Sequence, residues 1–455
     1  MDQNRLFADL AYGLPAEVER YYRGGDFAAA NARIDRLLQA ERLPAPAKNA
    51  LLACREIMRR IPDNYTLDRA AALAALREQI PDFTEQEFDA LVQADRIDWR
   101  YLNGTPYYLD RFVSALALYP DLQARGLQAP PADTARDEMI ARMRRNGSAA
   151  ARITVRAAVA PPEGTDPAAE FEAWLPFPAA CAQQSDIELL DAAPGYELAP
   201  ADAPQRTIHW RGGAGEKFVT YRYRIRADDL DMNSLTPAAD QSGAGDPDGP
   251  TAQDLAEQSP HIRFTPWLRA LCARLTAGCT GPLEKAKAIY DYVTRNTNYR
   301  YQPAYVCLED IAENCARSGW GDCGVMALLF IALCRMAGVP ARWQSGLYVT
   351  PDEIGAHDWA QFYVAPYGWL WADCSFGSGA NRVGCEERRQ HYFGNLDPLR
   401  MVANRAFYAP LTPPDPCFRN DPYDNQTGEA VLNGRPLHGE QLVREQTVLS
   451  FEVEA

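Results

Sequence analysis

Three residue types that together build a nucleophilic cysteine site occur in order in the second half of the chain. Cys323 lies in the segment Gly-Asp-Cys-Gly, His357 follows in His-Asp-Trp, and Asp373 follows in Trp-Ala-Asp. A thiol can attack a carbonyl carbon, an imidazole can move its proton, and a carboxylate can orient the imidazole. The order and types of these residues therefore indicate an enzyme with a cysteine nucleophile.

A long helix is predicted to position Cys323. The residues from Val325 to Ala337 are apolar on nearly every face, and Gly338 is a typical residue just beyond a helix end. Only the thiolate form of cysteine is a strong nucleophile, and the partial positive charge at a helix N-terminus favours an anion. We therefore expect Cys323 at the start of a buried, rigid helix.

His357 and Asp373 lie on two predicted strands that a turn containing Pro and Gly joins. Side chains alternate along a strand, so the two residues share a face only in some registers. They become diagonal neighbours if Trp359 lies opposite Asp373, and they lie on opposite faces if Val364 lies opposite Trp369. We expect the first register, or a bulge with the same effect.

Simpler interpretations exist for each residue. A single cysteine on an apolar helix is usually a core residue, and a single histidine on a strand is usually structural. The chain has only five histidines, and one of them follows the helix with an aspartate 373 − 357 = 16 positions later, which favours the catalytic interpretation.

Asp358 is a competing carboxylate. As the direct neighbour of His357 it should point to the other face of the strand, so Asp373 is the favoured partner.

The segment from about Pro282 to Gly377 resembles the core of the transglutaminase-like superfamily of cysteine enzymes. The resemblance implies a papain-like arrangement with Cys323 as nucleophile, His357 as general base and Asp373 as orienting acid. It also implies thiolate attack on an amide carbonyl and an acyl-enzyme. Hydrolysis of a peptide or amide bond is the expected outcome, and the alternatives are transfer to an amine and a non-catalytic binding scaffold. The matching motifs are Gly321-Asp322-Cys323, Ala337-Gly338-Val339-Pro340-Ala341-Arg342, His357-Asp358-Trp359 and Gly368-Trp369-Leu370-Trp371-Ala372-Asp373.

Acyl transfer also needs hydrogen-bond donors for the oxyanion. The backbone N–H of Cys323 is the first candidate, and Tyr299 and Trp320 are candidates for the second donor. Packing is the simpler interpretation for both aromatic side chains. The sequence has no CxxC pair and no calcium-loop pattern, so we expect no metal and no other cofactor.

Composition limits the partners. The net charge of −15 argues against nucleic acid and anionic membranes, so the expected partner is a peptide or protein substrate. No run approaches the ~18 apolar residues of a membrane span, and no apolar leader follows Met1. Eleven scattered cysteines favour a reducing compartment, so a cytoplasmic location is expected. The sequence does not indicate an oligomeric state.

The period of the apolar residues predicts an α+β multidomain protein. Residues 1–125 are predicted to be a helical domain with a winged-helix-like hairpin, residues 150–230 a β-sandwich, and residues 258–455 the papain-like, transglutaminase-like catalytic domain with its cysteine helix on an antiparallel sheet. The alternating run at residues 446–454 is expected to add an edge strand to the catalytic sheet or to the sandwich.

Within the helical domain, the residues from Ala16 to Glu41 show amphipathic spacing. Thr84 and Glu87 predict a capping box, and Asn103-Gly104 predicts a two-residue hairpin turn. The helix that would enter a DNA groove is acidic, so we expect a packing or protein-contact role for this domain.

Overall fold

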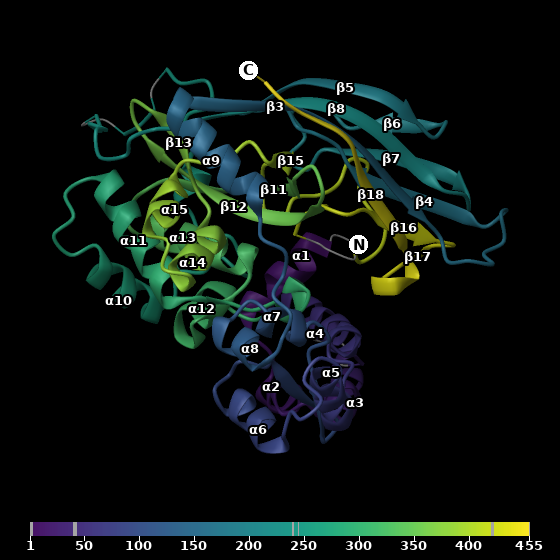
Figure 1. Cartoon of the computed structure of the whole chain (residues 1–455). Helices are drawn as coiled ribbons and strands as arrows, with labels where there is room; N and C mark the ends of the chain where they lie inside the picture. Colours follow the sequence, from purple (N-terminus) through teal and green to yellow (C-terminus); the bar gives the residue numbers. More distant parts are fainter. Residues whose placement is uncertain (1–2, 40–42, 239–240, 244, 420–422, 455) are drawn as a thin grey trace.

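The computed structural model describes residues 3–39, 43–238, 241–243, 245–419 and 423–454, and it shows the expected α+β multidomain architecture (Figure 1). A helical N-terminal region, a β-sandwich and a mixed core region follow one another along the chain. Within the described ranges, none of the helices combines the length and the apolar character that crossing a membrane requires.

The N-terminal region is helical with one hairpin. The capping box at Thr84 and Glu87 is confirmed, and so is the hairpin, whose turn residues Asn103 and Gly104 both have positive φ. The amphipathic segment that starts at Ala16 forms two helices rather than one, and its predicted end lies outside the described residues. The elements are α1 (Gln3–Ala8), η1 (Asp9–Tyr12), α2 (Ala16–Arg23), α3 (Phe27–Leu38), α4 (Ala45–Asn64), α5 (Arg69–Arg77), α6 (Glu85–Gln93), β1 (Trp99–Leu102), β2 (Thr105–Tyr108), α7 (Phe112–Leu116) and α8 (Pro120–Arg125).

The β-sandwich is formed by two sheets with strand orders β17-β16-β4-β7-β6 and β18-β3-β8-β5. Inward-facing residues such as Ile153, Trp210 and Tyr221 form its core. The last strand pairs with β3, so the predicted edge strand joins the sandwich and not the catalytic sheet. The elements are α9 (Thr134–Asn146), β3 (Ser148–Ala160), β4 (Glu170–Pro176), β5 (Gln184–Ala192), β6 (Tyr196–Leu198), β7 (Thr207–Gly213), β8 (Lys217–Asp228), β16 (Glu429–Leu432), β17 (Arg435–Pro436), η4 (Gly439–Gln441) and β18 (Val443–Val453).

This topology differs from the predicted limits, which placed residues 258–455 together in the catalytic domain. The residues from 429 to 453 return to the sandwich because β16 pairs with β4 and β18 pairs with β3. Figure 1 shows these C-terminal strands, in yellow, beside the blue and teal strands of the sandwich.

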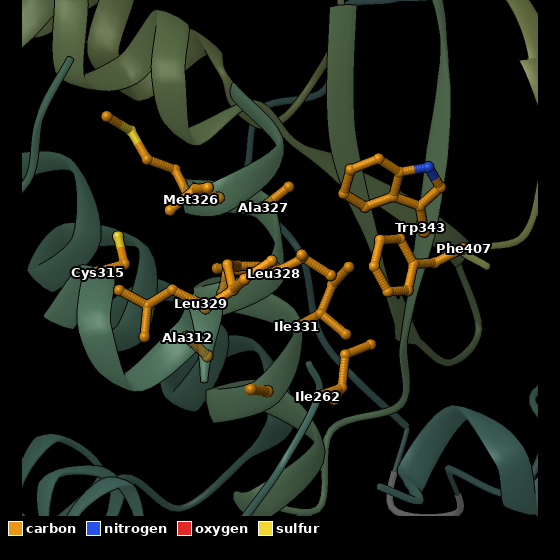
Figure 2. Packing of buried hydrophobic residues seen from close by; sticks show 14 of the residues in the cluster. Ile262, Ala312, Cys315, Met326, Ala327, Leu328, Leu329, Ile331, Trp343 and Phe407 are labelled. Carbon is orange, nitrogen blue, oxygen red and sulfur yellow. The ribbon is translucent and has the colours of Figure 1, made fainter. Parts of the chain in front are cut away.

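The core region contains a five-stranded sheet of order β14-β13-β12-β11-β15, with α13 packed on β12 and β11. The apolar residues of α13 lie between α12 on one side and Trp343 and Phe407 on the other (Figure 2). The elements are η2 (Ala252–Leu255), α10 (Pro266–Leu275), α11 (Pro282–Asn296), β9 (Asn298–Tyr299), η3 (Tyr305–Cys307), α12 (Ile311–Ser318), β10 (Trp320–Gly321), α13 (Cys323–Met336), β11 (Ala341–Val349), β12 (Ile354–Val364), β13 (Gly368–Ala372), α14 (Cys374–Arg382), α15 (Glu386–His391), β14 (Phe393–Gly394) and β15 (Arg400–Asn404).

The register of β12 and β13 is the expected one. Ala360 pairs with Ala372 and Val364 pairs with Gly368, so the ladder, continued by one step, sets Trp359 opposite Asp373. The alternative pairing of Val364 with Trp369 does not occur.

Gly346 in β11 is required by a close approach of two backbones. A Cβ atom at this position would lie 1.9 Å from the carbonyl oxygen of Met401 in β15. We expect Gly346→Ala to lower the free energy of unfolding by about 1–3 kcal/mol, because β15 must shift. Chemical denaturation measures this change. Gly355→Ala is the matched control, since a Cβ at Gly355 meets nothing within 4 Å; equal stability of the two variants would contradict the prediction.

Candidate active site

Cys323 is the first residue of α13, as expected. The Asp322 side chain caps the helix by accepting a hydrogen bond from the Val325 N–H at 3.1 Å. The twelve residues from Gly324 to Arg335 are all buried, so the helix is fixed in the core. As the first helical residue, Cys323 has an N–H with no partner in the helix, which suits it to bind an oxyanion. The thiol itself is half-buried.

The sulfur of Cys323 is hydrogen-bonded to Asp358 and not to His357. Its thiol donates to Asp358 Oδ2 at 3.3 Å. His357 and Asp358 are neighbours on β12, and adjacent side chains point to opposite faces of a strand. The expected orientation of Asp358 away from the face of His357 is therefore consistent with the structure, and the face to which Asp358 points is the one that carries the thiol.

Asp358 belongs to a buried polar cluster that includes residues from the C-terminal part of the chain. Its Oδ1 accepts a hydrogen bond from Gln426 Nε2 at 2.6 Å, and Gln426 also donates to the His357 carbonyl oxygen at 3.0 Å. Asp424 lies against Asp358, and its Oδ2 accepts from Ser345 Oγ at 2.5 Å. Burial and the charge of Asp358 hold the pKa of Asp424 well above its ordinary value. The proton shared by this pair is therefore favoured on Asp424.

This environment keeps Cys323 protonated. Burial raises the pKa of the thiol well above its ordinary value, and the charges of Asp358 and Asp322 raise it further. The backbone N–H of Asp358 opposes this effect. Tyr305 closes the cluster, because its hydroxyl donates to Asp322 Oδ1 at 2.6 Å and lies 3.4 Å from Asp358 Oδ2. In this conformation Cys323 is a thiol, and any nucleophilic attack by its sulfur would first require the hydrogen bond to Asp358 to break.

His357 and Asp373 form a buried pair. His357 Nε2 lies 2.7 Å from Asp373 Oδ2, and Asp373 is fully buried. Asp373 also caps α14, since its Oδ1 accepts from the Phe376 N–H at 3.0 Å. Arg400 Nη2 lies 3.1 Å from Asp373 Oδ2 and 2.9 Å from Asp397 Oδ2, with every partner buried. The carboxylate is held in place from three sides.

The pair favours a neutral imidazole and an ionised carboxylate. Burial lowers the pKa of His357, Asp373 opposes this effect, and Arg400 adds to it. Burial raises the pKa of Asp373, but His357 and Arg400 outweigh burial and hold the pKa below its ordinary value. A neutral imidazole whose Nε2 is engaged by a carboxylate retains Nδ1 as the atom that can accept a proton.

The two candidates for the second oxyanion donor lie in different surroundings. Burial raises the pKa of the Tyr299 phenol well above its ordinary value, and the neighbouring Cys323 and Asp322 raise it further. Tyr299 is therefore a neutral hydroxyl near the thiol, and its role as a donor stays a prediction. The Trp320 ring lies under Arg300 at 5.4 Å and edge-on to Tyr119 at 6.2 Å, which agrees with a packing role.

Several residues of the site carry no recognisable signal in the sequence. Tyr305, Asp424, Gln426 and Arg400 lie in no motif, and the last three follow the segment that resembles a known family. A single sequence gives no reason to connect Asp424 with Asp358, because only the fold brings them together. In the described parts of the chain, no three His, Cys, Asp or Glu residues are grouped so as to hold a metal ion. The expectation of no metal stays a prediction.

Comparison with known proteins places one segment of the chain in a known superfamily. Residues 269–374 match the family model described as the transglutaminase-like superfamily, which confirms the resemblance expected from the motifs. An uncharacterised protein of Haemophilus influenzae is 26% identical over 145 residues, which are 27% of this chain. The match spans only 39% of that relative.

Two solved structures align with this chain at low similarity. A putative cysteine protease from Cytophaga hutchinsonii aligns with a TM-score of 0.42 and 15% identity, covering 67% of this chain and 91% of the other. The periplasmic domain of TgpA from Pseudomonas aeruginosa aligns with a TM-score of 0.29 and 17% identity, covering 56% of this chain and 94% of the other.

Proposed function

We propose that this chain, whose residues 269–374 form a transglutaminase-like core, is a cysteine-dependent acyl-transfer enzyme that hydrolyses peptide or amide bonds. Two observations together support this proposal most. Cys323 is the first residue of a buried helix, and the same region holds a buried His357–Asp373 pair. Each of the three side chains is positioned by a separate element: α13, β12 and the cap of α14.

In this conformation His357 lies on the face of β12 opposite to the thiol, so the proposed reaction requires a rearrangement that brings the two side chains together. Cys323 then leaves Asp358 and gives its proton to the free nitrogen of His357. The thiolate then attacks the amide carbonyl, and the Cys323 N–H stabilises the oxyanion. The C–N bond breaks, the amine leaves with the proton from His357, and a thioester remains. Water, which His357 deprotonates, cleaves the thioester and releases the acid and the thiol. Asp373 stabilises the imidazolium at each proton transfer.

Transfer of the acyl group to an amine is the second candidate, because the same thioester can react with an amine in place of water. Hydrolysis is the leading proposal because water is always present. A cytoplasmic location stays a prediction, and the eleven free cysteines, none of them in a disulfide, support a reducing compartment.

A library of denatured cell-extract peptides tests the proposal, with and without dansylcadaverine as an amine. We expect new peptide N-termini, detected by mass spectrometry, with the wild-type protein and none with Cys323→Ser. His357→Ala should lower the cleavage rate by about 10²- to 10⁴-fold, because general-base assistance is lost.

His438→Ala, which removes an imidazole from the sandwich end of the chain, is the matched control and should retain the wild-type rate. Dansyl groups on glutamine side chains without new N-termini would assign transamidation instead of hydrolysis. If neither product forms, or if Cys323→Ser forms as much as the wild type, the acyl-transfer proposal fails and the binding scaffold remains.

A further inference from the structure

A groove of about 590 Å³ lies between the hairpin of the N-terminal region and the core region. It is lined on one side by Asp98, Trp99 and Arg100 and on the other by residues of α12. Trp320 and Val325 also line it, and both lie within three residues of Cys323, so the groove reaches the first turn of α13. Figure 1 shows α12 next to the N-terminal helices.

The groove is cationic although the chain is acidic. Four arginines line it, Arg23, Arg100, Arg300 and Arg317, against two carboxylates, Asp98 and Glu309. The chain as a whole has a net charge of −15. The acidic surface of the chain repels anions, whereas the cationic groove attracts them. The groove can therefore select an anionic ligand.

Three of the four arginines have partners. Arg23 pairs with Glu309 at 2.9 Å and Arg317 pairs with Glu313 at 2.6 Å. Arg300 Nη1 donates to the carbonyl oxygen of Asp95 at 2.6 Å, and its Nη2 lies 3.6 Å from Asp98. These pairs hold the walls of the groove together and use both carboxylates that line it.

Arg100 is the exception. Its guanidinium lies 5.8 Å from the centre of the Tyr65 ring, and the residue is half-buried. Asp98, on the same side of β1, is occupied by Arg300 and by the Tyr65 hydroxyl at 3.2 Å. In the parts of the chain that the structure describes, the Arg100 guanidinium makes no hydrogen bond or ion pair, although its backbone pairs with Tyr107 in the hairpin. The buried Arg300 Nε also lacks an acceptor. Burial lowers the pKa of Arg100, but its acidic neighbours, Asp98 among them, outweigh burial, so the guanidinium stays charged. A carboxylate can bind such a guanidinium with two parallel hydrogen bonds.

We propose that this groove binds a carboxylate-bearing segment of a peptide substrate, with Arg100 as its anchor, and leads the peptide to Cys323. Only the second part of the inference, that the peptide is led to Cys323, rests on the proposed function. Gln302 and Asn314 also line the groove, and their amide nitrogens donate to the carbonyl oxygens of Arg300 and Glu309, which leaves the amide oxygens to accept from a peptide N–H. Arginine is the residue suited to bidentate recognition of carboxylates.

Fluorescence anisotropy with tetramethylrhodamine-labelled hexaglutamate and hexaglutamine tests the anchor. The full-length Cys323→Ser protein is used so that no peptide is consumed. We expect hexaglutamate to bind more tightly, with an affinity that falls as salt increases. Arg100→Gln should weaken binding by about tenfold or more, because a charged hydrogen-bonded pair is lost.

Arg100→Lys, which keeps the charge without the planar fork, should retain part of the affinity and shows that the variant protein is folded. Arg211→Gln is the matched control, since its guanidinium is 66% exposed, already paired with Glu170, and outside the groove. Equal binding of the two peptides, or equal binding by wild-type and Arg100→Gln proteins, would overturn the proposal.

Protection of the thiol tests the path to Cys323. Saturating hexaglutamate should slow the reaction of Cys323 with iodoacetamide in the wild-type protein, as read by peptide mass spectrometry. Binding that depends on Arg100 without any protection would show that the groove does not lead to the thiol. The binding assay needs no turnover, so its failure is distinct from a failure of the proposed acyl transfer.

Discussion

Replacing Asp358 by asparagine makes Cys323 react faster with iodoacetamide at neutral pH. Asparagine has the shape of aspartate without its charge, so the thiolate no longer faces an anion at hydrogen-bond distance. The pKa of Cys323, which burial and then Asp358 raise, therefore falls toward its ordinary value. We expect the labelling rate to rise by about fivefold or more, because two like charges at this distance repel by at least ~1 kcal/mol. Labelling as a function of pH measures it.

Asp424→Asn is the matched control. The raised pKa of Asp424 favours its protonated form, and an asparagine there can likewise donate to Asp358 and accept from Ser345. Labelling of Cys323 in this variant should stay close to that of the wild type, with Cys385 in the same digest as a reference thiol. Slower labelling of Asp358→Asn would contradict the prediction and would instead make Asp358 the base that takes the proton from Cys323.

Replacing Arg400 by methionine lowers the stability of the protein strongly. Arg400 is fully buried, and its guanidinium is shared by the buried carboxylates of Asp373 and Asp397. Methionine fills a similar volume but leaves both carboxylates without their cation. Removal of one partner of a buried ionic group costs about 3–5 kcal/mol, so we expect a clear fall in the thermal midpoint. Calorimetry measures it.

The pH dependence gives this prediction a second signature. A carboxylate whose pKa is depressed in the folded state stabilises the fold above its unfolded pKa, and this stabilisation is lost as the pH falls through the folded pKa. Arg400 is one of the groups that lower the pKa of Asp373. In Arg400→Met that pKa rises, so the loss of stability in acid begins at a higher pH than in the wild type.

Arg317→Met is the control, because the exposed pair of Arg317 and Glu313 contributes at most about 1 kcal/mol. A thermal midpoint of Arg400→Met equal to that of the control would contradict the prediction. The prediction would also be contradicted if the pH at which stability is lost in acid were the same in Arg400→Met as in the wild type.

The sequence by itself determined the elements that hold the site. The apolar run after Cys323 has the composition of a buried helix, and the glycine after it ends the helix as expected. Side-chain alternation left two registers of β12 and β13 open, and the one that sets His357 beside Asp373, which was expected because the two residues are a candidate catalytic pair, is the register that forms. These features depend on local chemistry, which a short stretch of residues contains.

The tertiary structure alone decided which side chain meets the sulfur. Strand alternation shows that His357 and Asp358 point to opposite faces, but it does not show on which face α13 packs. The partners of Asp358 come from positions more than sixty residues later, and Arg100 comes from more than two hundred residues before the thiol. Such contacts depend on how the sandwich, the helical region and the core pack together, and no local pattern of residues encodes that packing.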